Sequence, residues 1–255
     1  MIGFSHSPLD WAALLCAPVV GSFAGVVVDR TARGENFATG RSHCEACRHD
    51  LQPYDLVPVF SWLALRGRCR YCHAEIRPSH LLIELAAVSI AVIAFLFSTG
   101  PALWAGCLLG WTLLAMALID LKTLRLPDFG NYLLIAGGMA VTYILAPDAA
   151  IDHAIGAVSG FLTLFVVSWL YRQIRGRDGL GLGDAKLLAA GGAWLGWQAL
   201  PEILMISGIA GLIVAIVAQN GLSFDRYRVV AFGPYLALAI WITWLVGPIE
   251  AGAFE

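Results

Sequence analysis

The stretch GLGLGDAK, at residues 179–186, lies between two long apolar runs. Its three alternating glycines leave the backbone with little side-chain cover. A carboxylate, Asp184, follows at the mouth of the next apolar run. Ionisable side chains in or beside membrane helices are costly and mark functional sites, although an aspartate here could also simply cap the next helix. A second carboxylate, Asp120, ends another apolar run, which favours a functional role for both.

The composition is that of a membrane protein. Of 255 residues, 59% are hydrophobic and 13% are charged, whereas a soluble domain carries about 25% charged residues. The apolar residues fall in runs of about twenty, the length that lets a helix cross roughly 30 Å of hydrocarbon. Strands of a membrane barrel would be about ten residues long and alternate in polarity. We therefore expect an all-α, polytopic membrane protein.

Eight apolar windows predict about eight transmembrane helices. Tight turns are expected at Gly100 with Pro101 and at Pro201. Pro127 should restart a helix, and Asp128 after it is expected to cap that helix. The windows are residues 9–28, 81–98, 101–119, 129–146, 153–171, 185–199, 201–219 and 229–247.

The basic residues are confined to one side of this arrangement. All 16 Lys and Arg residues fall between the first and second, third and fourth, fifth and sixth, or seventh and eighth helices. The positive-inside rule then places these connections in the cytoplasm and both termini outside. Asp120 and Asp184 are expected at the same cytoplasmic edge of the membrane. Because no Lys or Arg precedes Arg30, we interpret the first apolar run as a retained helix and not a signal peptide.

The only sizeable polar segment lies between the first two helices. We therefore expect three parts in the chain. These are a first transmembrane helix at residues 1–29, a small cytoplasmic zinc-binding insert at residues 30–80, and a seven-helix membrane core at residues 81–255.

Two Cys-x-x-Cys pairs lie within this insert. Cys44 and Cys47 form one pair and Cys69 and Cys72 the other, with residues 48–68 between them. Such pairs are typical of a structural zinc site with four thiolate ligands. A loop of this size buries little apolar surface, so a metal would contribute folding energy. The alternative is a pair of redox motifs, but no thioredoxin-like pattern of strands and helices accompanies them.

Asp120 and Asp184 are the candidate catalytic residues. Two carboxylates held close together do not both ionise easily, so one keeps a proton near neutral pH. Such a pair can activate water as a base and protonate a leaving amine as an acid. Gly181 and Gly183 would let a peptide backbone approach closely, and together with Lys186 they form the candidate active-site loop.

Two other classes of function remain open from these residues. Buried carboxylates also serve membrane carriers and proton relays. Both candidate aspartates lie at one membrane edge, however, and no second polar layer occurs at mid-depth. A non-catalytic membrane adaptor with a zinc module would account for the cysteines, but it leaves the paired aspartates and the glycine run without a role.

Beyond these residues, the sequence resembles the type IV prepilin peptidases. The similarity covers most of the chain and consists of several separate motifs. They are SWLALRGRCRYC at residues 61–72, Asp120 with LPD at 126–128, GDAKLLAA at 183–190, WLGW at 194–197, and FGPYLA at 232–237.

The resemblance implies a membrane aspartic endopeptidase of the bacterial inner membrane. Its substrates would be type IV prepilins or the pseudopilins of type II secretion, cut on the cytoplasmic side of their hydrophobic helix. Its partners would be these proteins and membrane lipid, with no nucleic acid. Many family members also methylate the new amino terminus with S-adenosylmethionine. The sequence has no strand and glycine-rich loop of the Rossmann kind, so the methyl donor is implied by the resemblance alone.

The chain departs from the family pattern in its first helix. After GSF at residues 21–23, the family continues with leucine, asparagine and two valines, whereas residues 24–27 here are AGVV. Gly25 stands where the family pattern has the asparagine, so if that asparagine serves the active-site entrance or the methyl transfer, the resemblance does not extend to this detail.

Overall fold

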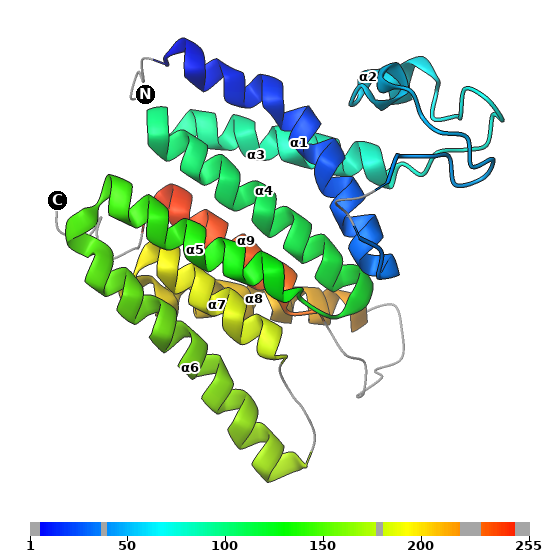
Figure 1. Ribbon diagram of the computed structural model, residues 1–255. Helices are drawn as coiled ribbons and strands as arrows, with labels where there is room; N and C mark the ends of the chain where they lie inside the picture. Colours follow the sequence, from blue (N-terminus) through cyan, green and yellow to red (C-terminus); the bar gives the residue numbers. More distant parts are fainter. Residues whose placement is uncertain (1–5, 37–39, 177–180, 220–230, 248–255) are drawn as a thin grey trace. The chain divides into compact units, whose positions relative to one another are not determined.

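The computed structural model describes residues 6–36, 40–176, 181–219 and 231–247 (Figure 1). Within these ranges the regular secondary structure is helical, and the extended backbone is limited to two isolated bridges in the cysteine-rich insert. This confirms the all-α prediction. The chain divides into two compact units, Met1–Trp111 and Thr112–Glu255, and each is described by itself.

The predicted apolar windows each coincide with a helix, and the helix starts at Gly100 and Leu200 agree with the expected turns. Two short helices, η1 (Pro53–Leu56) and α2 (Phe60–Ala64), lie in the insert. The eight that match the windows are α1 (Pro8–Arg33), α3 (Ser79–Phe97), α4 (Gly100–Thr123), α5 (Asp128–Leu145), α6 (Ala150–Arg175), α7 (Leu182–Leu195), α8 (Leu200–Gln219) and α9 (Gly233–Val246).

Several of these helices have the dimensions of membrane spans. Five segments within the described residues are long and apolar enough to cross a bilayer, and α9 is apolar but shorter. The chain is therefore a membrane protein, while a count of eight crossings remains a prediction. The five segments are Pro8–Arg33, Ser79–Phe97, Gly100–Thr123, Pro147–Arg175 and Trp197–Val217.

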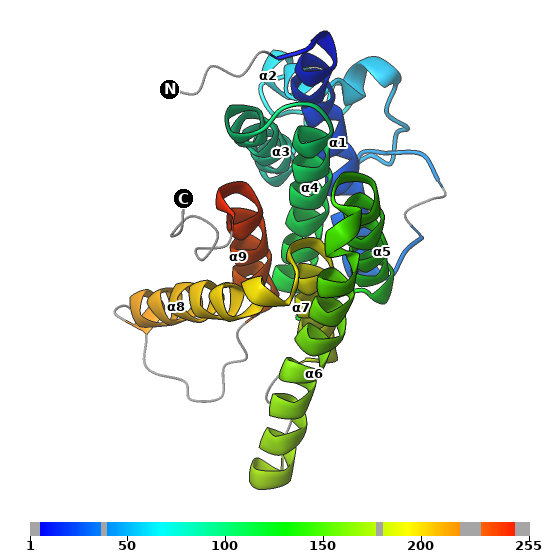
Figure 2. The same ribbon diagram turned by 90° about the vertical axis from the view of Figure 1, so that its left-hand side faces the viewer.

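The first unit is built on the close packing of α1 against α3, which run side by side in Figures 1 and 2. A Cβ at Gly21 would lie 2.7 Å from the Cα of Glu84, so only glycine permits this approach. At the other end of α1, buried Asp10 closes a capping box with Ser7 and accepts a hydrogen bond from the Gly100 N–H at 3.0 Å. These contacts join the starts of α1 and α4.

The second unit is organised around α7, which packs against α5, α6, α8 and α9. Ten of its 14 residues are buried, most of them alanine, glycine or leucine. Small residues let membrane helices approach closely. A Cβ at Gly160 of α6 would lie 2.7 Å from the carbonyl oxygen of Leu188. Trp194 donates from its indole to the Leu134 carbonyl at 2.7 Å and joins α7 to α5.

The expected three-part division at residues 1–29, 30–80 and 81–255 remains a prediction. The boundary between the two compact units falls inside α4, after Trp111. The described helices place both candidate catalytic aspartates in the second unit and all four cysteines of the predicted zinc site in the first.

Candidate active site and metal centre

Asp120 lies in the last turn of α4 and is 5% exposed. Its Oδ2 atom accepts a hydrogen bond of 3.0 Å from the backbone N–H of Gly233, at the start of α9. A Cβ at position 233 would lie 2.7 Å from this same oxygen. The contact therefore requires a glycine, and it orients one of the two carboxylate oxygens of Asp120.

Asp184 lies in the first turn of α7 and is 9% exposed. Its backbone N–H donates to the carbonyl of Gly181 at 3.1 Å, which closes the turn that begins the helix. The carboxylate lies near enough to Asp120 for the charge of one to act on the other. The structure thus brings together two aspartates that are 64 positions apart in the sequence.

Leu126 fills the space beside this pair. A Cβ on Gly183 would lie 2.8 Å from the Leu126 Cβ, and a Cβ on Gly233 would lie 3.3 Å from its Cδ1. The amide of Asn131, which is fully buried in α5, donates to the Gly183 carbonyl at 3.5 Å. The two glycines thus pack on one leucine, and the backbone before Asp184 is held from α5.

Lys186, predicted as part of the active-site loop, is joined by its side chain to the start of α5. Its Nζ forms an ion pair with Asp128 and lies 5.4 Å from the ring centre of Tyr132. The expectation that Asp128 caps α5 is wrong, because Pro127 holds the N-cap position and no side chain caps the helix. Asp128 instead connects the first turn of α5 to that of α7.

Three contributors to the site were not predicted as such: Gly233, Leu126 and Asn131. Gly233 acts through its backbone N–H, for which a sequence carries no specific signal. Asn131 did carry a signal in the sequence, because an amide side chain within an apolar helix must find a hydrogen-bond partner. Part of the opening stretch, at residues 179–180, lies outside the described residues, as do the basic positions Arg226 and Arg228.

This arrangement has the components needed for acid and base catalysis on a peptide. Both carboxylates are largely buried and lie close enough for their charges to interact, and neither is joined to Lys, Arg or His in the part of the chain that the structure describes. Hydrolysis by an aspartate pair requires a water between them, one carboxylate as base and the other as acid. Gly183 and Gly233 are covered by Leu126, whereas a Cβ on Gly181 would meet no side chain closer than Asp184 Oδ2 at 3.5 Å, so the backbone is open to a peptide at Gly181.

The four cysteines of the insert form a second cluster. The sulfurs of Cys44, Cys47, Cys69 and Cys72 all lie within 4.8 Å of one another, and the Cys44 and Cys72 sulfurs are 3.8 Å apart. Tetrahedral zinc with Zn–S bonds of about 2.3 Å separates its sulfurs by about 3.8 Å. The geometry and the donor atoms therefore fit a zinc ion.

The two Cys-x-x-Cys segments fold as matching turns. In each, the residue after the second cysteine has a positive φ, 58° at Arg48 and 57° at His73. Its backbone N–H donates to the carbonyl of the first cysteine, at 2.9 Å in one turn and 3.0 Å in the other. This repeated backbone geometry aims two thiols from each segment at a common point.

The thiols of this cluster have shifted pKa values, and the Cys47 backbone N–H lowers the pKa of Cys44 to about 7. The Ala74 backbone N–H acts to lower the pKa of Cys72, but burial and the three neighbouring thiols outweigh it and raise that pKa to about 11. Four sulfurs this close repel one another as thiolates. A divalent metal removes that repulsion, because thiolates are its ligands.

Asp55 supports the second turn from η1. Its side chain accepts hydrogen bonds from Arg70 Nε at 2.7 Å, from the Tyr71 hydroxyl at 3.3 Å and from the Gln52 N–H at 3.2 Å. Burial acts to raise the pKa of Asp55, but these donors and the Arg70 charge outweigh it and lower that pKa. The residues between Cys69 and Cys72 are thereby attached to the rest of the insert.

Comparisons with known proteins agree with both sites. Residues 15–98 match the family model described as the bacterial peptidase A24 N-terminal domain, and residues 107–216 match that of the type IV leader peptidase family. The cysteine cluster lies in the first match, and both aspartates lie in the second. No solved structure matches the chain at a significant level.

Curated relatives extend this similarity over nearly the whole chain, and each is named prepilin leader peptidase/N-methyltransferase. The Aeromonas hydrophila protein is 39% identical over 213 residues, which cover 83% of this chain and 73% of the relative. The Burkholderia pseudomallei protein is 39% identical over a match that covers 88% of this chain and 81% of the relative. The Stutzerimonas stutzeri protein is 34% identical over a match that covers 92% of this chain and 91% of the relative. The chain therefore belongs to the type IV leader peptidase family.

Proposed function

We propose that this protein is an aspartic endopeptidase that removes the leader peptide of type IV prepilins or pseudopilins and methylates the new amino terminus. The observation that carries the peptidase part is the juxtaposition of Asp120 and Asp184, from the end of α4 and the start of α7. Family membership and the names of the relatives support the same chemistry. They do not favour the alternative of a carrier or proton relay.

In this proposal the two aspartates hold one water and one proton between them. The Gly233 N–H orients Asp120 Oδ2, so the second oxygen is directed at the water. One carboxylate takes a proton as the water attacks the scissile carbonyl, and the other donates a proton to the leaving nitrogen. The low exposure of both side chains strengthens these interactions by excluding bulk water.

Both aspartates lie at helix ends, which suits a substrate cut beside its own membrane helix. Asp120 is in the last turn of α4, and Asp184 is in the first turn of α7. With the one-sided distribution of basic residues, this supports an active site at the cytoplasmic edge of the inner membrane. The partners are then prepilin-like proteins within the lipid bilayer, with no role for nucleic acid.

The cysteine cluster is proposed as a structural zinc site. The ligands would be Cys44, Cys47, Cys69 and Cys72, a closed set of four without an open position for a substrate. Zinc would fold the insert by joining its two turns. S-adenosylmethionine would be the methyl donor for the second activity, as the N-methyltransferase name of the relatives supports.

Mass spectrometry of a co-expressed prepilin tests both activities together. With the unaltered protein, we expect a product that lacks the leader and carries one extra methyl group. Asp184→Asn should leave the precursor uncut, while Asp148→Asn, a matched change in an exposed connection, should have no effect. An uncut precursor with the unaltered protein, or full cleavage by Asp184→Asn, would contradict the proposal.

A further inference from the structure

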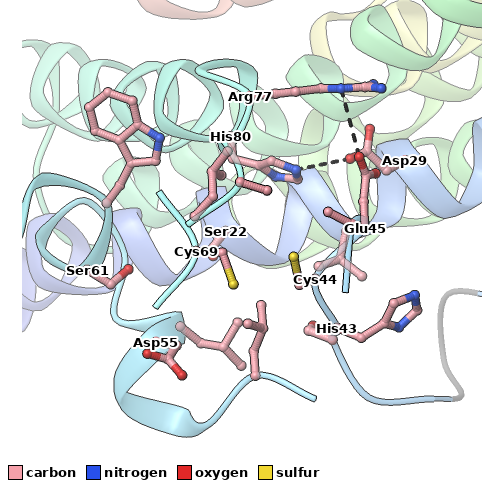
Figure 3. Close-up of a pocket in the computed structure, with 18 of the residues that line it drawn as sticks. Ser22, Asp29, His43, Cys44, Glu45, Asp55, Ser61, Cys69, Arg77 and His80 are labelled. Carbon is pink, nitrogen blue, oxygen red and sulfur yellow. Dashed lines mark ion pairs between the residues drawn. The ribbon is translucent and has the colours of Figure 1, made fainter. Parts of the chain in front are cut away.

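The short helix α2 of the cysteine-rich insert has two different faces. Ser61 and Trp62 line a cavity of about 520 Å³ between the insert, α1 and the start of α3, as Figure 3 shows for Ser61. The Trp62 ring is held there, because a Cβ at Gly67 would lie 2.8 Å from its Cζ2 atom. Phe60 and Leu63 are three positions apart and therefore share the other face of the helix. Neither of them belongs to the lining of the cavity.

The outward face of α2 is apolar and exposed. Phe60 is 73% exposed and Leu63 is 56% exposed. Leu56 and Val57, which lead into the helix, are exposed as well. Exposed apolar side chains that gather in one place mark a surface that binds a protein or a membrane. We call these four residues the outer patch.

The outer patch lies at the level of the membrane-spanning helices and not beyond their ends. Val59, within the same segment, donates its N–H to Glu84 Oε2 at 2.7 Å. Glu84 lies in α3, about 8 Å past the start of this candidate span. On the other side, Ser22 lines the same cavity as Ser61 and lies about 16 Å before the end of α1 (Figure 3). The insert therefore packs beside the last turns of α1 and the first turns of α3.

The bond between Val59 and Glu84 also fixes the direction of α2. Val59 has a φ of 63°, a left-handed conformation that β-branched residues rarely adopt. Such a conformation persists only where surrounding contacts determine it. Here the contact comes from a glutamate that is 7% exposed, and it acts on the residue just before the helix begins. The outer patch is thus held outward by a rigid attachment to α3.

Two arginines border the patch at the end of α2. Arg66 and Arg68 are exposed, and among the described residues neither forms an ion pair or a side-chain hydrogen bond. The Arg66 N–H donates to the Leu63 carbonyl at 3.1 Å, so this arginine directly follows the helix. The guanidinium group is well suited to bind phosphate. Apolar side chains on one face with arginines beside them are typical of a helix that lies in a lipid interface.

From these features we propose that the outward face of α2 lies in the boundary between the headgroups and the acyl chains of the bilayer. Phe60 and Leu63 contact acyl chains, and Arg66 and Arg68 bind lipid phosphates. Interfacial helices bury their apolar face about 5–10 Å into this boundary. Lipid is favoured over a protein partner because it surrounds α1 and α3 at this level. The insert is then attached to the membrane at a third place, besides the two helices that it connects.

Photo-crosslinking of the full chain in phospholipid vesicles tests this placement. Phe60→benzoylphenylalanine keeps an aromatic side chain and makes it photoreactive, and Leu63→benzoylphenylalanine serves if the first protein does not elute as a single folded species. After irradiation, mass spectrometry should find phospholipid attached to the peptide that contains the probe. The same probe at Asp50, an exposed residue of the insert outside the patch, should give at least about tenfold less lipid adduct.

Arg66→Gln, combined with the probe at residue 60, tests the charged border of the patch. It should lower the yield of lipid adduct about twofold to fivefold, because the end of α2 loses its contact with phosphate. Arg48→Gln is the matched control, since Arg48 is also an exposed arginine of the insert with a positive φ, 58° against 51° at Arg66. It should leave the yield unchanged.

Three results would overturn the proposal. They are a probe that attaches to another protein chain, the absence of lipid adduct at both patch positions, and equal yields in the two arginine variants. None of these measurements depends on prepilin cleavage. A failure of the proposed peptidase function would therefore be seen separately from a failure of this lipid contact.

Discussion

The Oδ2 atom of Asp120 and the backbone N–H of Gly233 are joined by a hydrogen bond of 3.0 Å between α4 and α9. The two residues are 113 positions apart in the sequence, and the contact leaves no room for a side chain at position 233. This bond determines how one of the two proposed catalytic carboxylates is oriented.

Gly233→Ala should therefore inactivate the enzyme without removing a catalytic group. The new methyl group would lie 2.7 Å from Asp120 Oδ2 and 3.3 Å from Leu126 Cδ1, so the carboxylate or α9 must shift. A displacement of about 1 Å at a reacting group can cost about 100-fold in rate. The measurement is the initial rate of prepilin cleavage in detergent.

Gly208→Ala is the matched control for this change. Gly208 lies in α8, and a Cβ there would meet no atom within 4 Å. Its cleavage rate should equal that of the unaltered protein. Equal rates for the two alanine variants would show that the Gly233 contact does not orient Asp120.

The ion pair of Lys186 with Asp128 should position the start of α7 and should not bind substrate. Lys186→Met and Asp128→Asn should each lower kcat about threefold to tenfold, and the double variant should be no worse than either single one, because the two side chains act as one unit. Unfolding free energy should change by less than about 1 kcal/mol, since the pair is partly exposed. If the loss of kcat in the double variant equals the product of the two single losses, Lys186 and Asp128 have separate roles.

Metal removal tests the role of the cysteine cluster. Cys69→Ser, or chelation of the unaltered protein, should make proteolysis within residues 30–80 about tenfold faster or more, because the four thiols join the two turns. Part of the prepilin cleavage should survive, since the aspartates belong to the other compact unit. Elemental analysis should find about one zinc per chain, and protein with reduced thiols and no metal would contradict the assignment.

Membrane topology can be measured independently of activity. Reporter fusions after Pro147 and after Gly176 lie on either side of α6 (Ala150–Arg175) and should report opposite sides of the membrane. The positive-inside rule places the second one in the cytoplasm. Signals from the same side would contradict both the eight-helix prediction and the cytoplasmic position of the aspartates.

Much of the fold was predictable because apolar length and charge distribution act locally along the chain. The eight windows, the turn at Gly100 and the cysteine turns all follow from such local signals. Asp120 and Asp184 could be identified from the sequence because a carboxylate at the end of an apolar helix is costly and therefore indicates a function. The residues that contact them could not be identified in this way, since Gly233 acts through its backbone N–H and Leu126 through the shape of its side chain. These contacts exist only once α4, α5, α7 and α9 have packed.

Asp128 illustrates a different limit. Aspartate at the start of a helix is a common capping residue, and the sequence offered no local reason to prefer another role. The competing partner, Lys186, lies 58 positions away on α7. Glu84 is a similar case, because its acceptor role toward Val59 depends on how the insert folds back onto α3.

The cleavage kinetics of the aspartate variants test the central claim most directly. Asp120→Asn, Asp184→Asn and the double variant should all lose cleavage by at least about 1,000-fold to a common residual rate, because the two residues act as one unit. The unaltered enzyme should show a bell-shaped pH profile, since it needs one acid and one base. Substrate binding should persist in each variant. Substantial cleavage by either single variant, or losses that multiply in the double variant, would contradict the account.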